Sequence, residues 1–481
     1  MFFVFTQFVI PQYGQNFERE FVKYWYYRDR LQYFVYPGTE KGESIIMTCR
    51  NGCKDFTDSY PPYFSIEFAQ THKLMGYYIG VLATEYKLLI NNGQISDALS
   101  TLNELDMALE ALNRMDMCES DAPWFSEAIL NGFFIRNDVP PVLSLEMSDG
   151  LNKNCRFGTY QDYFNFIEVE GYKGMPFGIL NNAVGCTNMY ESSLNYFYQF
   201  PDAVFDRVSY NLHGTQYWSY WKQQNFTSSD EIIGDYLGLS LVAELVDDEL
   251  TKQKAIEIAE RYLSIADGIV DTIPFQMYFP NGDEISLGSG GNTKGFIYGL
   301  CKSLQRMSNN SIVCNSHDAM QTLYNSPVDF YATFNNTPNF YNRPLYSTLI
   351  AISRKSHAYS DVNAIVNIGN EANLQVFYLL LWAVLHNKDL RNNSLYPMDQ
   401  LVNDLYSAPC EGPYFYDWYD WYSEVKTFSA GWACQYKYGA NLYSQENGGD
   451  HFGIFPGLDY MLLYNLACLA FPDGFEYNNQ T

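Results

Sequence analysis

The hydrophobic pattern is clearest between residues 73 and 114, where it predicts two consecutive helices. Residues 73–90 (KLMGYYIGVLATEYKLLI) are apolar nearly all round, which is typical of a helix enclosed by other helices. The sequence NNGQ at 91–94 interrupts this run, and Gly93 suits a helix C-terminus. A second, amphipathic helix is then predicted, because apolar residues recur at spacings of three and four: Ala98, Leu102, Leu105, Leu109 and Leu112. Together they form an inner–outer helical hairpin.

The same layout returns further along the chain without the same sequence. Residues 229–246 (SDEIIGDYLGLSLVAELV) are apolar after an acidic start, and an amphipathic stretch at 251–267 follows a short DDEL link. Further apolar helical stretches lie at 295–304, 345–353, 373–386 and 457–471. The pattern therefore predicts a mainly helical, all-α protein.

Long aromatic and polar loops connect these helices, at 54–64, 151–220, 278–292 and 405–455. Residues 277–288 (MYFPNGDEISLG) carry an Asn-Gly turn between alternating residues and predict a small β-hairpin. We expect one large helical unit over residues 65–481, preceded by an N-terminal extension over residues 1–64.

Alternating inner and outer helices resemble the layout of the six-hairpin glycosidase-like proteins, over roughly residues 65–471. Three segments also resemble a group of exported Bacteroidota proteins: WYYRDRLQYFV at 25–35, LNGFFIRNDVP at 130–140 and GLDYMLLYNL at 457–466. The first resemblance implies an α/α-toroid and action on carbohydrates. The second implies export and carries no reaction with it.

Composition and the N-terminus narrow the possible partners and the location. The formal charge of −26, without a basic stripe, disfavours nucleic acid as a partner. The longest apolar run, near 376–385, is about half the ~20 residues needed to span a bilayer. Residues 1–10 (MFFVFTQFVI) and the following PQYGQ resemble the apolar region and cleavage zone of a secretory signal, although no basic segment leads them. We interpret residues 1–15 as a signal remnant and expect an exported protein.

Ten cysteines permit disulfides, but a chain of this size does not require them, and buried free thiols are the simpler expectation. No nucleotide-binding, serine-hydrolase or metalloprotease motif occurs in the chain. We therefore expect neither a cofactor nor a metal ion.

The first candidate catalytic group is an acidic start to an apolar helix. Asp230 and Glu231, with Asp235 one turn later, follow an aromatic loop that contains Trp218 and Trp221. Glycoside hydrolysis needs two carboxylates, and aromatic rings stack on sugars. Asp230 or Glu231 is the expected general acid, because inner helices of a toroid begin at the mouth of its cleft. The same acids would alternatively serve only to stabilise the helix dipole.

The remaining candidates lie in the long loops. Asp149 or Asp450 is the expected partner carboxylate, and His451 beside Asp450 would orient a base or bind sugar hydroxyls. Trp418 and Trp421 would form a carbohydrate platform if exposed, and packing if buried.

Arginines have two interpretations. Arg28 and Arg30 are expected to tie the N-terminal segment down by ion pairs, with bidentate binding of a substrate carboxylate as the alternative. Arg156 would contact substrate. In a lyase it would neutralise a uronate carboxylate, provided that it converges with His451 and Tyr220.

Three functions stay open at this point. The leading one is an exported glycoside hydrolase that acts on a neutral or weakly charged glycan. A polysaccharide lyase is the nearest enzymatic rival. A non-catalytic surface protein that binds glycan or another protein through its aromatic loops is the alternative from a different class. A fold by itself does not choose among them.

Overall fold

A computed structural model of the chain describes a helical body and short segments attached to it. The described residues are 20, 24–25, 27–28, 31, 35–36, 45–46, 49–51, 65–67, 71–117, 130, 132, 134, 229–267, 276–278, 284–286, 293–308, 342–353, 375–388, 390, 398–407, 415–416, 453–454 and 457–471. Most of these residues are helical, which confirms the prediction of a mainly helical protein. No helix among them is long and apolar enough to cross a membrane.

The helices follow the apolar stretches of the sequence closely. Two hairpins, α2–α3 and α9–α10, match the predicted inner–outer pairs. The helices are α2 (Thr71–Asn91), α3 (Ile95–Met117), α9 (Ser229–Leu245), α10 (Glu249–Asp267), α11 (Thr293–Ser308), α14 (Asn342–Ser353), α16 (Gln375–Leu385), α17 (Met398–Ser407) and α19 (Leu458–Ala470). Gly93 ends the first hairpin's inner helix with φ of 71°, a conformation that glycine adopts without strain.

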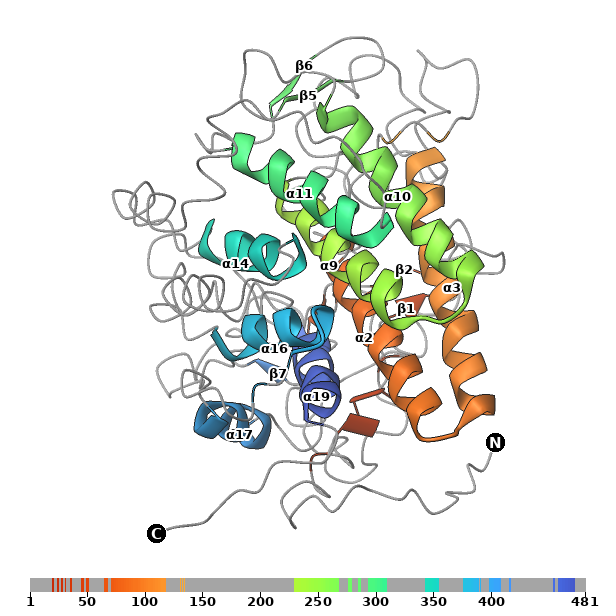
Figure 1. The fold of residues 1–481 in the computed structure, drawn as a ribbon, viewed down its shortest axis with the longest axis vertical. Helices are drawn as coiled ribbons and strands as arrows, with labels where there is room; N and C mark the ends of the chain where they lie inside the picture. Colours follow the sequence, from red (N-terminus) through yellow and green to blue (C-terminus); the bar gives the residue numbers. More distant parts are fainter. Residues whose placement is uncertain are drawn as a thin grey trace, which may run out of the picture.

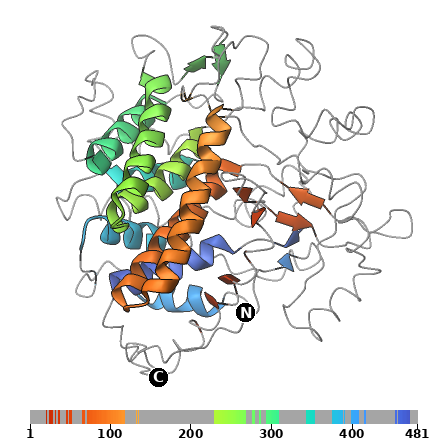
Figure 2. The ribbon, with the colours of Figure 1, turned by 90° about the vertical axis from the view of Figure 1, so that its right-hand side faces the viewer.

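Short strands form three antiparallel groups. β1 (Val35–Tyr36) pairs with β2 (Ile45–Ile46), and β5 (Gln276–Tyr278) pairs with β6 (Glu284–Ser286). The second pair overlaps residues 277–288, where the sequence predicts a hairpin. A four-stranded sheet has the order β4-β3-β8-β7, with its members at Ser65–Glu67, Cys49–Asn51, Gly453–Ile454 and Phe415–Tyr416. Figure 2 shows this sheet beside the helices. It joins the N-terminal extension to the segment before α19.

Six helices contact one another in a closed cycle. α2 packs on α9, α9 on α11, α11 on α14, α14 on α16, α16 on α19, and α19 packs back on α2. In Figure 1, α11, α14 and α16 follow one another down one side, while α2, α3 and α10 lie on the other. The helices α3, α10 and α17 each follow and contact a member of the cycle, so they form an outer layer.

Arg306 on α11 brings together the C-terminal halves of several members of the cycle. Its guanidinium donates to the backbone carbonyls of Ser240, Ile352 and Leu385, at 3.4, 2.7 and 3.5 Å. It also donates to the Glu244 carboxylate at 2.9 Å. Each partner lies in the C-terminal half of its helix, so the C-terminal halves of α9, α11, α14 and α16 converge at this guanidinium. A cation at helix C-termini is favoured by their dipoles.

The α2–α9 crossing depends on glycines that leave no room for a side chain. A Cβ at Gly76 would lie 1.9 Å from the carbonyl oxygen of Gly234, and one at Gly238 would lie 2.2 Å from the carbonyl oxygen of Gly76. The two helices carry the sequences GYYIG at 76–80 and GDYLG at 234–238. Backbone therefore packs directly on backbone, and α2 is fixed against α9 with little freedom to shift.

The N-terminal segment is tied to the first hairpin as predicted. Arg28 Nε donates to Glu85 at 2.9 Å, and its two terminal nitrogens donate to the two carboxylate oxygens of Glu104 at 3.2 and 2.5 Å. The predicted ion pairs of Arg28 are thus confirmed. Arg30 lies outside the described residues.

Candidate functional site

Two of the predicted site residues fall in described helix, both at the start of α9. Glu231 is fully buried. Asp230 belongs to the same first turn, but its side chain is outside what the structure describes. The other predicted site residues lie outside the described residues: Asp149, Arg156, Trp218, Trp221, Trp418, Trp421, Asp450 and His451. Tyr220, proposed for the lyase alternative, also lies outside them.

The most organised polar group among the described residues is a buried cluster of His72, Asp235 and Tyr262. His72 Nδ1 lies 2.9 Å from Asp235 Oδ2, and the Tyr262 hydroxyl donates to the same oxygen at 2.5 Å. The Tyr262 hydroxyl also lies 2.9 Å from His72 Nδ1. Because an ionised carboxylate only accepts, Nδ1 carries the ring proton when Asp235 is charged. The close α2–α9 crossing places these side chains together.

Burial dominates the electrostatics of this cluster. Loss of water raises the pKa of Asp235, while the charge of His72 and hydrogen bonds from His72 and Tyr262 lower it, and the charge of Glu231 raises it. The pKa of Tyr262 is raised well above its usual value, first by burial and then by the negative charge of Asp235. Asp235 Oδ1 has no hydrogen-bond partner among the described residues. Burial therefore favours the neutral forms of both Asp235 and Tyr262.

The cluster lies between the inner and outer helices. Tyr262 belongs to the outer helix α10, and the Tyr236 hydroxyl of α9 donates to the α10 carbonyl of Ala259 at 2.6 Å. The ring of Phe134 stacks on Tyr262 with centroids 3.7 Å apart, which closes the cluster from a further side. Since the charge of Glu231 acts on both Asp235 and Tyr262, Glu231 belongs to this interlayer region.

A different set of side chains meets on the inner side of the cycle. Tyr77 of α2 stacks on Phe377 of α16 with ring centroids 5.8 Å apart, although these helices are not neighbours in the cycle. A Cβ at Gly80 would lie 3.4 Å from methyl groups of both Leu237 of α9 and Leu462 of α19. Leu237 of α9 and Leu462 of α19 therefore both pack against α2 at Gly80.

Helical periodicity relates two acidic positions to these inner faces. Position 230 precedes Leu237 by seven residues, two turns, and therefore falls on the same face of α9. Asp459 precedes Leu462 by three residues on α19, and is itself almost fully buried. Its Oδ1 accepts a hydrogen bond from the Tyr460 amide at 2.9 Å.

The sequence reasoning missed Asp459, although the same signal was present. It is an acid in the first turn of an apolar helix, as Asp230 is, and it directly follows Gly457–Leu458 in one of the quoted segments.

Neither a metal site nor a resemblance to a known protein adds to the description of the site. Among the described residues, no three His, Cys, Asp or Glu side chains could jointly hold a metal ion. No family of known proteins, no curated protein and no solved structure matches this chain significantly.

Proposed function

We propose that the chain is an exported, glycan-active protein, a glycoside hydrolase built on an α/α-toroid. The observation that carries the proposal is the pair of acidic positions, 230 and 459, at the N-terminal ends of α9 and α19. These helices both pack on α2, and positions 230 and 459 lie on the same helix faces as Leu237 and Leu462, which contact α2 at Gly80.

The toroid is supported by the direction of the helices as well as by their order. α2 runs parallel to α9, because Gly76 meets Gly234 near one end and Lys87 pairs with Asp247 at 3.3 Å near the other. α19 runs parallel to α2, since Gly80 meets Leu462 and Thr84 bonds to Asn465 further along both helices. Parallel inner helices, with outer helices returning the chain, are the defining arrangement of an α/α-toroid.

In the proposed mechanism Asp230 protonates the glycosidic oxygen and Asp459 acts as base or nucleophile. Glycoside hydrolysis divides these roles between two carboxyl groups, about 5–5.5 Å apart for retention and roughly 6.5–9.5 Å for inversion. Relative to the facing Leu237 and Leu462, positions 230 and 459 differ by about 6 Å along the helix axes, at 1.5 Å per residue. That offset is compatible with either outcome.

Cysteine chemistry supports export. Cys301 is disulfide-bonded, whereas Cys468 is a buried free thiol. Disulfides persist in oxidising compartments outside the cytosol. The free thiol agrees with the expectation from the sequence, and the disulfide departs from it.

The test is product analysis on a panel of neutral and weakly charged glycans. The proteins are wild type, Asp230→Asn, Asp459→Asn and the matched control Glu231→Gln. We expect cleavage by wild type, loss of at least 100-fold in both Asn variants, which remove a catalytic carboxyl, and retained cleavage in the control. Cleavage that survives Asp230→Asn and Asp459→Asn but disappears in Glu231→Gln would overturn the assignment of roles.

One observation favours a second candidate, the non-catalytic binding protein. The described acids at this end of the helices, Glu231, Asp235 and Asp459, are each no more than 1% exposed. Such burial is typical of acids that stabilise helices and packing. This function would show as a glycan-dependent rise in melting temperature, with no product, in wild type and in the variants alike.

A further inference from the structure

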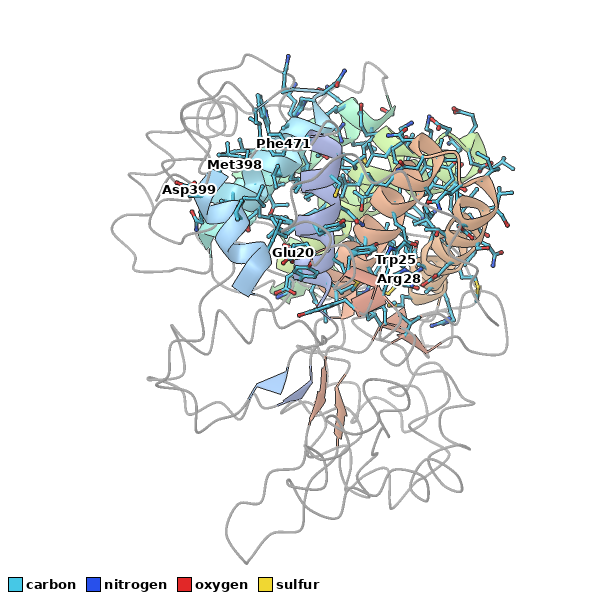
Figure 3. All side chains as sticks on the ribbon, turned by 90° about the horizontal axis from the view of Figure 1, so that it is seen from below. Glu20, Trp25, Arg28, Met398, Asp399 and Phe471 are labelled. Atoms are coloured by element: carbon cyan, nitrogen blue, oxygen red, sulfur yellow. The ribbon has the colours of Figure 1, made fainter. Side chains whose placement is uncertain are left out.

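The first helical residues that the structure describes lie against α19. Glu20, Tyr24, Tyr27 and Leu31 are all buried, and their spacings of four, three and four place them on one helical face. Figure 3 shows Glu20 beside α19, with Trp25 and Arg28 on the side of α2. We call residues 20–31 the N-terminal clasp.

On one side the clasp grips the start of α19. The Tyr460 hydroxyl donates to the Glu20 carboxylate at 2.8 Å across 440 residues of sequence. The rings of Tyr27 and Tyr460 lie 4.7 Å apart, and Tyr24 stacks on Tyr464 at 5.1 Å. The clasp therefore contacts α19 through both a buried hydrogen bond and stacked aromatic rings.

Gly457 makes the approach of the clasp possible. A Cβ at Gly457 would lie 2.1 Å from the ring of Tyr27, and the glycine has φ of 73°. Both the space and the backbone conformation require glycine at the residue before α19.

On its other side the clasp grips α2 and α3. The Tyr24 hydroxyl donates to Glu85 at 2.6 Å, and Arg28 joins Glu85 to Glu104. Glu85 also accepts from Thr101 at 2.8 Å, so both hairpin helices are included. Buried charges in such a network are stable only while all partners stay in place, because an unpaired buried charge is costly.

One residue of the clasp bonds to both sides at once. The Tyr24 hydroxyl donates to Glu85 of α2 and accepts from Asn465 of α19 at 3.1 Å. Burial is the largest cause that raises the pKa of this hydroxyl far above its usual value, so it stays protonated and keeps its donor role.

We propose that the N-terminal clasp is a strap that holds the α2–α19 seam closed. The two helices that form this seam lie far apart in the sequence, and Asn465 of α19 donates to the Val81 carbonyl and the Thr84 hydroxyl of α2. Release of the clasp opens the seam locally, while the α9–α10 hairpin and the helix ends around Arg306 stay packed. This inference concerns assembly of the cycle and does not depend on glycan cleavage.

Hydrogen exchange of the full-length chain followed by mass spectrometry tests the strap. Tyr460→Phe removes the hydroxyl bonded to Glu20 and leaves the ring. Tyr236→Phe is the matched control, because it removes one buried hydroxyl donor from the α9–α10 hairpin. Arg28→Met is a stronger clasp variant, which keeps the aliphatic stem of the side chain.

Local opening predicts a spatial pattern. In Tyr460→Phe, exchange should rise about tenfold, the scale of one lost buried hydrogen bond, in residues 81–91 and 458–471. Exchange in α10 and α11 should not change. In Tyr236→Phe, exchange should rise in α10 and α11 and stay unchanged in residues 81–91 and 458–471. In Arg28→Met, the rise in residues 81–91 and 458–471 should be larger than in Tyr460→Phe.

Two results would overturn the strap. An equal rise in all helices of Tyr460→Phe would mean that the clasp contributes only to global stability. No rise at the seam in either clasp variant would mean that α2 and α19 hold together without it.

Discussion

Gly76 lies at the closest approach of α2 and α9, where the structure permits a quantitative prediction. In Gly76→Ala the new methyl carbon would lie 1.9 Å from the Gly234 carbonyl oxygen and 2.6 Å from the amide nitrogen of Asp235. Both atoms belong to helix backbone, which cannot rotate away. The helices must therefore separate until the first distance reaches about 3.4 Å, the start of ordinary contact.

Two effects of opposite sign decide the size of the change. Alanine gains about 1 kcal/mol over glycine in helix propensity. Overpacking of a close contact costs about 1–3 kcal/mol, and here backbone rather than a side-chain end must move. Separation also stretches the 2.9 Å bond between His72 and Asp235, which contributes about 1 kcal/mol more. We expect a net destabilisation of about 2 kcal/mol.

Urea unfolding followed by near-ultraviolet circular dichroism measures this change, and Gly80→Ala is its matched control. A Cβ at Gly80 would meet leucine methyl groups at 3.1 and 3.4 Å, which can give way by small rotations. The gain in helix propensity then offsets the cost of the close contact. The free energy of unfolding of Gly80→Ala should therefore stay within about 0.5 kcal/mol of the wild-type value. Equal stability of the two variants would refute the close crossing.

Three further perturbations test the polar contacts. Arg306→Met should destabilise the chain by about 2 kcal/mol in thermal melts, because three backbone carbonyls of α9, α14 and α16 lose a charged donor. An unchanged melting temperature would contradict a stabilising role of Arg306. Asp248→Ala should cost about 1 kcal/mol, because Asp248 accepts from the amide and hydroxyl of Thr251 at the start of α10. Those bonds lower the pKa of Asp248. The stability that Asp248 contributes is therefore present above the ordinary carboxyl pKa and is lost as pH falls through the pKa of the folded state. Asp248→Ala should not show this loss. Burial raises the pKa of Asp235, so the stability of the wild type should fall as pH rises from the ordinary carboxyl pKa to the folded value. Asp235→Asn should remove this dependence of stability on pH. Parallel stability–pH curves for wild type and variant would contradict this.

The inner and outer helices could be predicted because their signals are local. Residues 73–90 are apolar all round, and the structure places them in α2, in contact with three other helices of the body. Alternating apolar and polar spacing identified α3 and α10 for the same reason. Each signal is contained within about five helical turns, so no knowledge of distant partners was needed.

The four-stranded sheet could not be predicted in this way. Its strands are two or three residues long, too short to show alternation, and the β3–β8 pairing joins Arg50 to Ile454. The His72–Asp235 contact is equally remote, at 163 residues apart. A single histidine in an apolar helix gives no sign of its partner, because the partner is set by the glycine crossing and not by neighbouring sequence.

The candidate site illustrates why neighbouring acids cannot be treated as one signal. The sequence offers Asp230 and Glu231 as interchangeable general acids, yet one residue along a helix is a rotation of about 100°. Glu231 and Asp235, four residues apart, share the side that contacts His72 and Tyr262 between the layers. Position 230 instead shares the face of Leu237, which packs against α2 at Gly80. The register of α9, fixed by its backbone contact with α2, thus places position 230 and Glu231 on different faces of the helix. Substituting each acid alone is therefore more informative than substituting both.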